Sequence, residues 1–199
     1  MIGDPQIRNR GTIGGSLAHS DPSGDWGAAV IALRASVKVS GGAGERTIPI
    51  DEFLVDTFTT ALKGDEILTQ VSAPVPVSGS GSAYLKLERK AGDFASVGVA
   101  AQLTVEPRPS GEYCSYAGIG LTAVGPKCLR ASGAEACLAG KLVTERTIAE
   151  ASEAAARDCQ PTDDPLRGSA GYKREMTRVY TRRALTLAVE RARRNRSSK

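Results

Sequence analysis

Apolar and polar residues alternate in three runs in the middle of the chain. These runs are "SAYLKLERK" (82–90), "ASVGVAAQLTVEP" (95–107) and "YCSYAGIGLTAVG" (113–125). Turn-forming residues separate them at "KAGDF" and "PRPSGE". Successive strands joined by short turns pair with their neighbours in antiparallel fashion. The pattern therefore predicts a three-stranded antiparallel meander.

Helical periodicity follows the meander. "SGAEACLAGK" and "ERTIAEASEAAARDC" predict two short helices, the second beginning near Thr147. After a polar connector, a long helix is expected from about 171 to 194. One stripe of this helix is expected to pack on the meander, and it consists of Met176, Val179, Tyr180, Ala184, Leu187 and Ala188. The second half of the chain is thus predicted to be a sheet backed by helices.

The first half carries shorter elements. A helix is predicted after Asp25, which we expect to cap it, with one apolar face formed by Trp26, Ala29, Val30 and Leu33. "SVKVS" and "RTIPI" around "GGAGE" predict a hairpin, "IDEFLV" a single helical turn, and "DEILTQVSAPV" a strand. "VSGSGS" at 77–82 marks the main boundary. The fold class is α+β, with parts at 1–80 and 81–199.

Composition narrows the classes of function. With 41% apolar and 24% charged residues, the chain is typical of a soluble globular protein. Its four cysteines form no C-x-x-C pair and it has one histidine, so we expect reduced thiols, a cytosolic setting and no metal site. No run is apolar enough to span a membrane. Charge gathers in the final residues, which predicts a solvated helix end or, as a remote alternative, a contact with nucleic acid.

The stretch "RNRGTIGGSLAHSDPSGD" (8–25) contains adjacent glycines and ends on an acidic residue. One interpretation is a turn that needs glycine for a positive φ angle. The other is a cradle in which main-chain N–H groups, Thr12 and Ser16 donate hydrogen bonds while Asp25 accepts them. A nucleotide cofactor requires both kinds of group. Lys86 alternates with Leu85 and Leu87, and this pattern alone favours a solvated lysine.

Two blocks go beyond such patterns. "IGDPQIRNRGTIGGSLAHSDPSGD", followed later by "YLKLERKAGDFASVGVAA", strongly resembles the FAD-binding medium subunits of molybdenum hydroxylases. Within the xanthine dehydrogenase group, the likeness is greatest to the aerobic carbon monoxide dehydrogenase branch. The resemblance implies the C-terminal part of a vanillyl-alcohol-oxidase-type FAD-binding domain. A carbon monoxide dehydrogenase flavoprotein C-terminal-like domain, a three-stranded antiparallel sheet backed by helices, then follows.

The resemblance also implies which residues bind the cofactor. The segment Thr12, Ile13, Gly14, Gly15 and Ser16 corresponds to a flavin motif that lies along the pyrophosphate and the flavin. Asp25 corresponds to an acidic residue that binds cofactor hydroxyls. Lys86 falls near a lysine beside the isoalloxazine, and Leu68 is a candidate for apolar packing against the flavin or adenine.

The implied function is electron transfer by an oxidoreductase subunit that is not active alone. Electrons would pass from 2Fe–2S clusters of a small partner subunit to FAD and on to an external acceptor. A large partner would hold the molybdenum cofactor, in a cytoplasmic dimer of heterotrimers. The family's N-terminal subdomain, with a first glycine-rich motif, has no counterpart in this sequence. An alternative is therefore a scaffold subunit that holds no flavin, and a remote one is an unrelated small-ligand-binding module.

Overall fold

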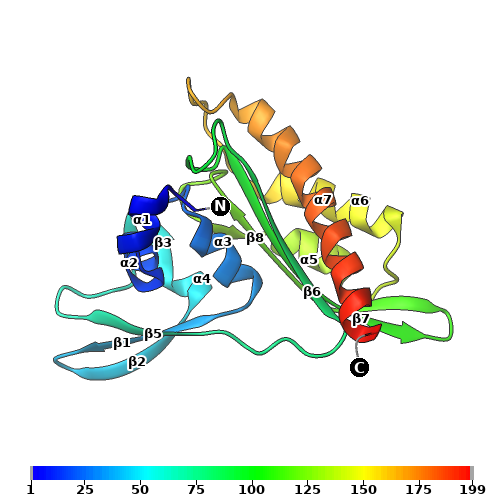
Figure 1. The fold of residues 1–199 in the computed structure, drawn as a ribbon, viewed down its shortest axis with the longest axis horizontal. Coiled ribbons are helices and arrows are strands. Elements are labelled where there is room, and N and C mark those ends of the chain that lie inside the picture. Colours follow the sequence, from blue (N-terminus) through cyan, green and yellow to red (C-terminus); the bar gives the residue numbers. More distant parts are fainter. Residues whose placement is uncertain (1, 198–199) are drawn as a thin grey trace.

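The computed structural model describes residues 2–197 and has an α+β fold built in two adjoining parts (Figure 1). The chain begins with three short helices, α1 (Pro5–Arg10), α2 (Ile13–His19) and α3 (Asp25–Ala32). Then come β1 (Ser36–Gly41), β2 (Gly44–Pro49), α4 (Ile50–Phe53), β3 (Leu54–Asp56), β4 (Thr59–Thr60) and β5 (Ile67–Ser72). The strands form a three-stranded sheet in the order β2-β1-β5 and a two-stranded sheet of β3 and β4. The hairpin, the helical turn and the strand predicted here are confirmed.

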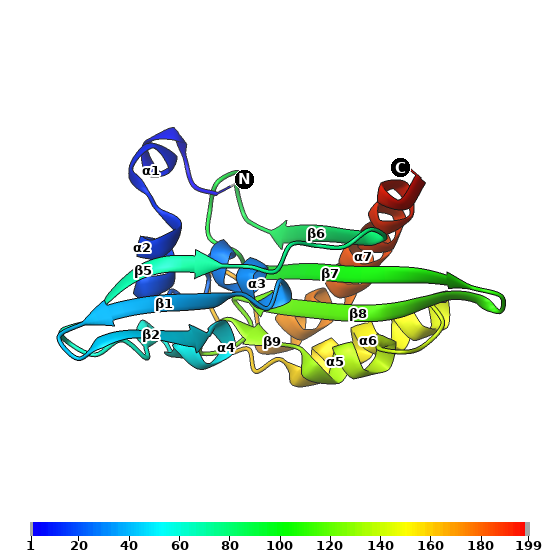
Figure 2. The ribbon, with the colours of Figure 1, turned by 90° about the horizontal axis from the view of Figure 1, so that it is seen from below.

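The second part begins with a sheet. It is formed by β6 (Ser80–Leu87), β7 (Val97–Arg108), β8 (Gly111–Thr122) and β9 (Leu129–Arg130), in the order β6-β7-β8-β9. The first three strands lie side by side as the predicted antiparallel meander (Figure 2). The fourth strand was not predicted, because two residues are too few to show alternation. It pairs with the end of β8 and extends the sheet.

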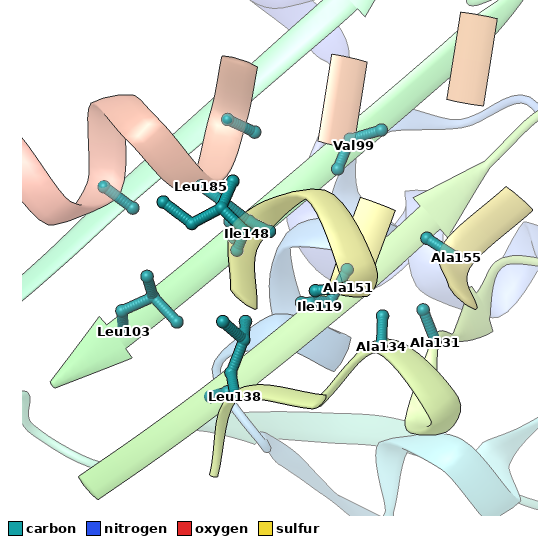
Figure 3. Packing of buried hydrophobic residues seen from close by; sticks show 14 of the residues in the cluster. Val99, Leu103, Ile119, Ala131, Ala134, Leu138, Ile148, Ala151, Ala155 and Leu185 are labelled. Atoms are coloured by element: carbon teal, nitrogen blue, oxygen red, sulfur yellow. The ribbon is translucent and has the colours of Figure 1, made fainter. Parts of the chain in front are cut away.

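Three helices cover one face of this sheet. They are α5 (Ser132–Leu138), α6 (Glu145–Asp158) and α7 (Ala170–Ser197). Aliphatic side chains of the strands and helices meet in one core, labelled in Figure 3 by Leu103, Ile119, Leu138, Ile148 and Leu185 among others. Helix α6 begins earlier than predicted, because the side chains of Thr144 and Thr147 form a capping box at its start.

The predicted buried stripe of α7 is partly wrong. Ala184 and Ala188 are buried as expected, but Val179 is half-buried and lines a groove against α6. Thr177 and Thr181 lie in its place, fully buried. Small residues are selected on this face because the helix backbone lies directly against the strands.

Helix α3 lies on the opposite face of the sheet, between the sheet and the first part of the chain (Figure 1). This close approach depends on two glycines of β8. A Cβ atom at Gly118 or Gly120 would lie 2.0 Å from the carbonyl oxygen of Ala32 or Ala28. The two parts are therefore joined by direct contact between a helix backbone and a strand.

Candidate functional site

The glycine stretch forms the start of a regular helix. Thr12 is the N-cap of α2, and its side chain accepts a hydrogen bond from the N–H of Gly15 at 3.0 Å. Gly14 and Gly15 have no positive φ angle, so the interpretation as a glycine-dependent turn is wrong. Helix geometry leaves the N–H groups of Ile13 and Gly14 without an acceptor inside the helix. The result is an exposed helix start with no side chain on two successive residues.

Asp25 is the first residue of α3, but its side chain does not cap the helix. Gly24 is the N-cap, and no side chain caps the free N–H groups. The Asp25 carboxylate instead accepts a hydrogen bond from the hydroxyl of Tyr84 and lies 3.0 Å from Nζ of Lys86. The expected cap is replaced by an ion pair because β6 brings a hydroxyl and an ammonium against this end of α3.

Lys86 is buried, contrary to the pattern of alternation that favoured a solvated lysine. Only 6% of its side chain is exposed. Besides Asp25, its ammonium contacts a carboxylate oxygen of Glu88 at 3.1 Å and the carbonyl oxygen of Asp93 at 2.9 Å. The strand's outer face is covered at this point by α3 and by the loop between β6 and β7, which a linear pattern does not reveal.

Each charged group of this cluster stabilises the charged state of its neighbours. Burial disfavours the charged ammonium, yet the hydrogen bonds and attraction of Asp25 and Glu88 outweigh it and raise the pKa of Lys86 above its ordinary value. Burial first, and then the negative charge of Asp25, raise the pKa of Tyr84 far above its ordinary value. Tyr84 therefore stays protonated and remains a hydrogen-bond donor throughout the physiological range.

A pocket of about 190 Å³ opens beside this cluster. It lies between the N-terminal segment (Ile2, Gly3), the turn from α2 to α3, and the loop from β6 to β7. Ser16 and Asp25 both line it, with the aromatic side chains of Trp26 and Phe94. Pockets that hold a whole small molecule are larger, about 300–1,000 Å³. This pocket has room for one group of a larger ligand.

Thr12, Ile13, Gly14 and Leu68 lie apart from that pocket. They line a second, shallow hollow between α2, α3 and β5, and Trp26 lines both hollows. Six of the eight predicted residues thus line one of two adjoining hollows along α2 and α3, whereas Gly15 and Lys86 line neither. Asp25 and Lys86 form an ion pair, and Thr12 accepts a hydrogen bond from Gly15 at the start of α2.

Sequence reasoning missed Tyr84, Glu88 and Phe94. Tyr84 and Lys86 are two positions apart on one strand, so they share a face, and this spacing was available as a signal. Glu88 continues the same face. Phe94 sits in a loop, and no periodicity marks a loop residue that returns to a pocket.

Within residues 2–197, no three His, Cys, Asp or Glu side chains are grouped so as to hold a metal ion. None of the helices in that range combines the length and the apolar character needed to cross a bilayer. All four cysteines are free thiols.

Comparison with known proteins gives a consistent result. Residues 1–76 match the family described as the FAD binding domain in molybdopterin dehydrogenase. Residues 82–188 match the CO dehydrogenase flavoprotein C-terminal domain.

Individual relatives agree with these matches. The chain is 42% identical over 188 residues to the carbon monoxide dehydrogenase medium chain of Hydrogenophaga pseudoflava, covering 94% of this chain and 64% of that protein. It is 36% identical to the 6-hydroxypseudooxynicotine dehydrogenase complex subunit alpha of Paenarthrobacter nicotinovorans, covering 96% and 64%.

Structural similarity is equally clear. A structure of carbon monoxide dehydrogenase from Hydrogenophaga pseudoflava, lacking the Mo-pyranopterin moiety of the molybdenum cofactor, superposes with a TM-score of 0.90. The identity is 43%, and the match covers 96% of this chain and 64% of that chain. The chain thus spans a little under two thirds of the length of these relatives. The fold and these matches together show that the chain belongs to the family of FAD-binding medium subunits of molybdenum hydroxylases, with the carbon monoxide dehydrogenase flavoproteins.

Proposed function

We propose that this chain is the FAD-binding, electron-transferring part of a molybdenum hydroxylase, an oxidoreductase subunit that is inactive alone. The observation that carries the proposal is the bare helix start of α2. Glycine in a helix costs up to about 1 kcal/mol relative to alanine. Gly14 has neither a positive φ angle nor a tight neighbour that would require glycine, since an added Cβ would lie 3.6 Å from Leu68. Binding of a ligand close to the main chain would account for a glycine at this position.

The helix start fits a diphosphate. Open N–H groups at a helix start attract anions, and the missing side chains allow a phosphate group to approach the main chain closely. In this proposal Thr12, Ile13, Gly14, Gly15 and Ser16 bind the pyrophosphate and the adjoining part of the flavin. Leu68 supplies apolar contact from the floor of the second hollow.

The pocket beside Asp25 fits a planar ring. Trp26 and Phe94 offer aromatic surface, and Asp25, paired with Lys86 behind it, offers charge at its edge. FAD, when bound, supplies a carrier that takes up an electron pair and can release electrons singly. The chain's own residues would bind that group, orient it and exclude water from it.

The partners and setting follow from the family. We infer a large subunit with the molybdenum cofactor and a small subunit with 2Fe–2S clusters, assembled as a dimer of heterotrimers in the cytoplasm. We place the boundary between the FAD-binding part and the C-terminal part at residues 80 and 81, and the family matches on either side of it support this placement. The relatives named above act on different substrates, so the substrate is selected by another chain of the complex.

The test is an FAD titration of the purified chain, alone and mixed with candidate partner subunits, followed by flavin fluorescence and the visible spectrum. Gly14→Ala should weaken FAD binding about tenfold or more, because a methyl group would separate the diphosphate from the main chain. The same substitution should leave the melting temperature unchanged or raised, since alanine favours the helix.

Gly171→Ala is the matched control. Gly171 is also the second residue of a helix, α7, and an added Cβ would meet no atom closer than 4.0 Å. This variant should bind FAD as the natural chain does. Absence of FAD binding under every condition would replace this proposal with the flavin-free scaffold, in which Asp25 and Lys86 only stabilise the fold.

A further inference from the structure

Two tyrosines of the sheet hold helix α3, one at each end. The hydroxyl of Tyr84 on β6 donates to the Asp25 carboxylate at the start of the helix. The hydroxyl of Tyr116 on β8 donates to the carbonyl oxygen of Ala32, at the end of the helix, at 2.9 Å. Only the first of these hydrogen bonds reaches a charged group that lines the pocket. Loss of the Tyr84 hydroxyl should therefore affect the pocket, whereas loss of the Tyr116 hydroxyl should not.

A glycine on the neighbouring strand leaves space for the Tyr84 side chain. Gly98 lies on β7 opposite Lys86, and an added Cβ at Gly98 would lie 2.8 Å from the Tyr84 hydroxyl. Thr122 fixes the turn before α3 from the same side, because its hydroxyl lies 2.9 Å and 2.8 Å from the carbonyl oxygens of Pro22 and Gly24. These neighbouring contacts constrain the positions at which Asp25 and Tyr84 form their hydrogen bond.

A chain of hydrogen bonds connects Tyr84 to the wall of the pocket. Tyr84 occupies one oxygen of the Asp25 carboxylate, which leaves the other oxygen for the Lys86 ammonium. That ammonium also donates to the carbonyl oxygen of Asp93. Asp93 and its neighbours Gly92 and Phe94 form the wall of the pocket that belongs to the β6–β7 loop. A hydrogen bond at the start of α3 is thereby linked to the position of this loop.

We propose that Tyr84 is a positioning residue of the site, which acts through Asp25 and Lys86 to hold the β6–β7 loop against the pocket. Asp25 then orients Lys86, while its carboxylate, which has further lone pairs, still lines the pocket. Loss of the Tyr84 hydroxyl would let the carboxylate and the ammonium rearrange and would release the loop. The part of this inference that concerns FAD rests on the proposed function above.

Tyr84→Phe and Tyr116→Phe form a matched pair. Each removes one hydroxyl that donates to α3 and keeps the ring. Hydrogen–deuterium exchange of the ligand-free chain should show several-fold faster exchange in residues 88–96 for Tyr84→Phe and no change there for Tyr116→Phe. FAD affinity should fall about tenfold in the first variant and stay unchanged in the second.

A double variant tests whether Tyr84 acts through Asp25. In the Asp25→Ala background, which removes the acceptor of the Tyr84 hydroxyl, Tyr84→Phe should add little to the loop exchange, because the two changes disrupt one chain of contacts. Equal exchange in both tyrosine variants, or an unchanged loop in Tyr84→Phe, would overturn the inference and leave the proposed function intact. A released loop in a chain that binds no FAD would support the positioning role and refute the proposed function.

Discussion

At the scale of single residues, charged side chains in this protein form sets that satisfy one another. Lys86 with Asp25 and Glu88 is one such set, and Arg46 with Glu66 is another. Both oxygens of Glu66 accept hydrogen bonds from Arg46 at 2.8 Å, and the N–H of Lys63 donates to the same carboxylate at 2.8 Å. Such a bidentate pair is stronger than a simple surface contact.

The acid titration of Glu66 gives a residue-scale prediction. Hydrogen bonds from Arg46, and then from the N–H of Lys63, lower the pKa of Glu66 to about 2. Because the pKa is lower in the folded than in the unfolded chain, the pair stabilises the fold above about pH 4.5 and this contribution disappears as the pH falls toward 2. Glu66→Gln should therefore lose stability at pH 6 and little at pH 2, as measured by urea unfolding at each pH.

Glu45→Gln is the control for this titration. Glu45 pairs with Lys38 at 3.1 Å, and its side chain is 60% exposed. Its replacement should change the unfolding free energy by less than about 1 kcal/mol at either pH. A difference between the wild type and Glu66→Gln that does not vary with pH would contradict the assignment.

At the scale of elements, small residues decide how the helices meet the sheet. α7 lies along β6 and β7 with alanine and threonine toward the strands. Gly81 of β6 faces this helix, and an added Cβ would lie 2.1 Å from the carbonyl oxygen of Ala188 and 2.3 Å from the nitrogen of Ala192. The periodicity of large apolar residues indicated the existence and length of α7, but its buried face is set by this close approach.

Gly81→Ala is accordingly expected to destabilise the protein. The methyl group cannot be accommodated by a side-chain rotation, because both neighbouring atoms belong to the helix backbone. Overpacking of this kind costs about 1–3 kcal/mol. Urea unfolding followed by circular dichroism should show the loss as a lower midpoint.

Gly64→Ala provides the comparison, since an added Cβ there meets nothing within 4 Å. Its unfolding midpoint should stay within the error of the wild type. If both variants unfolded at the wild-type midpoint, the close packing of α7 on β6 would be wrong.

At the scale of the whole molecule, a network of charges joins the two parts. Glu135 of α5 is buried and accepts hydrogen bonds from Arg34, which follows α3, and from Arg130 of β9, each at 2.7 Å. Its other oxygen accepts the N–H of Ile119 at 2.9 Å. Asp51 of α4 lies 3.8 Å from Arg34 and 3.5 Å from Arg130. The two parts should consequently unfold together.

Glu135→Ala should prevent the two parts from unfolding in one cooperative transition. Removal of the buried carboxylate leaves the main-chain N–H of Ile119 without its acceptor and leaves Arg34 and Arg130 with their longer contacts to Asp51, at a cost of about 1–3 kcal/mol. Urea unfolding can be followed by the fluorescence of Trp26, the single tryptophan, and by the circular dichroism of the helices. We expect coincident transitions in the wild type and separate ones in the variant.

Glu150→Ala serves as the control, because Glu150 pairs only at the surface with Arg146 on one face of α6. It should change the unfolding free energy by about 0.5 kcal/mol or less and leave the two transitions coincident. Coincident transitions in Glu135→Ala as well would mean that the contact of α3 with Gly118 and Gly120 is sufficient to couple the two parts.

The charged C-terminal end also belongs to this scale. Arg193 and Arg196 bond to Glu112, and Arg191 donates to the carbonyl oxygen of Ser82. The sequence showed a concentration of positive charge but not its acceptors, which are contributed by strands more than eighty residues away. These contacts hold part of that charge against the sheet.

The sequence by itself determined most elements and their order, because alternation, helical periodicity and turn residues are local properties. The meander, the helices behind it and the hairpin were predicted in this way, whereas the short elements α1, α2 and β9 were not, and the family was identified by resemblance. The candidate residues came from the family resemblance, whereas Tyr84, Glu88 and Phe94 were missed. Only the tertiary structure decided which polar residues are buried together, as with Lys86, and which face of α7 packs on the sheet. Burial depends on what covers a residue, and here the cover comes from segments remote in the sequence.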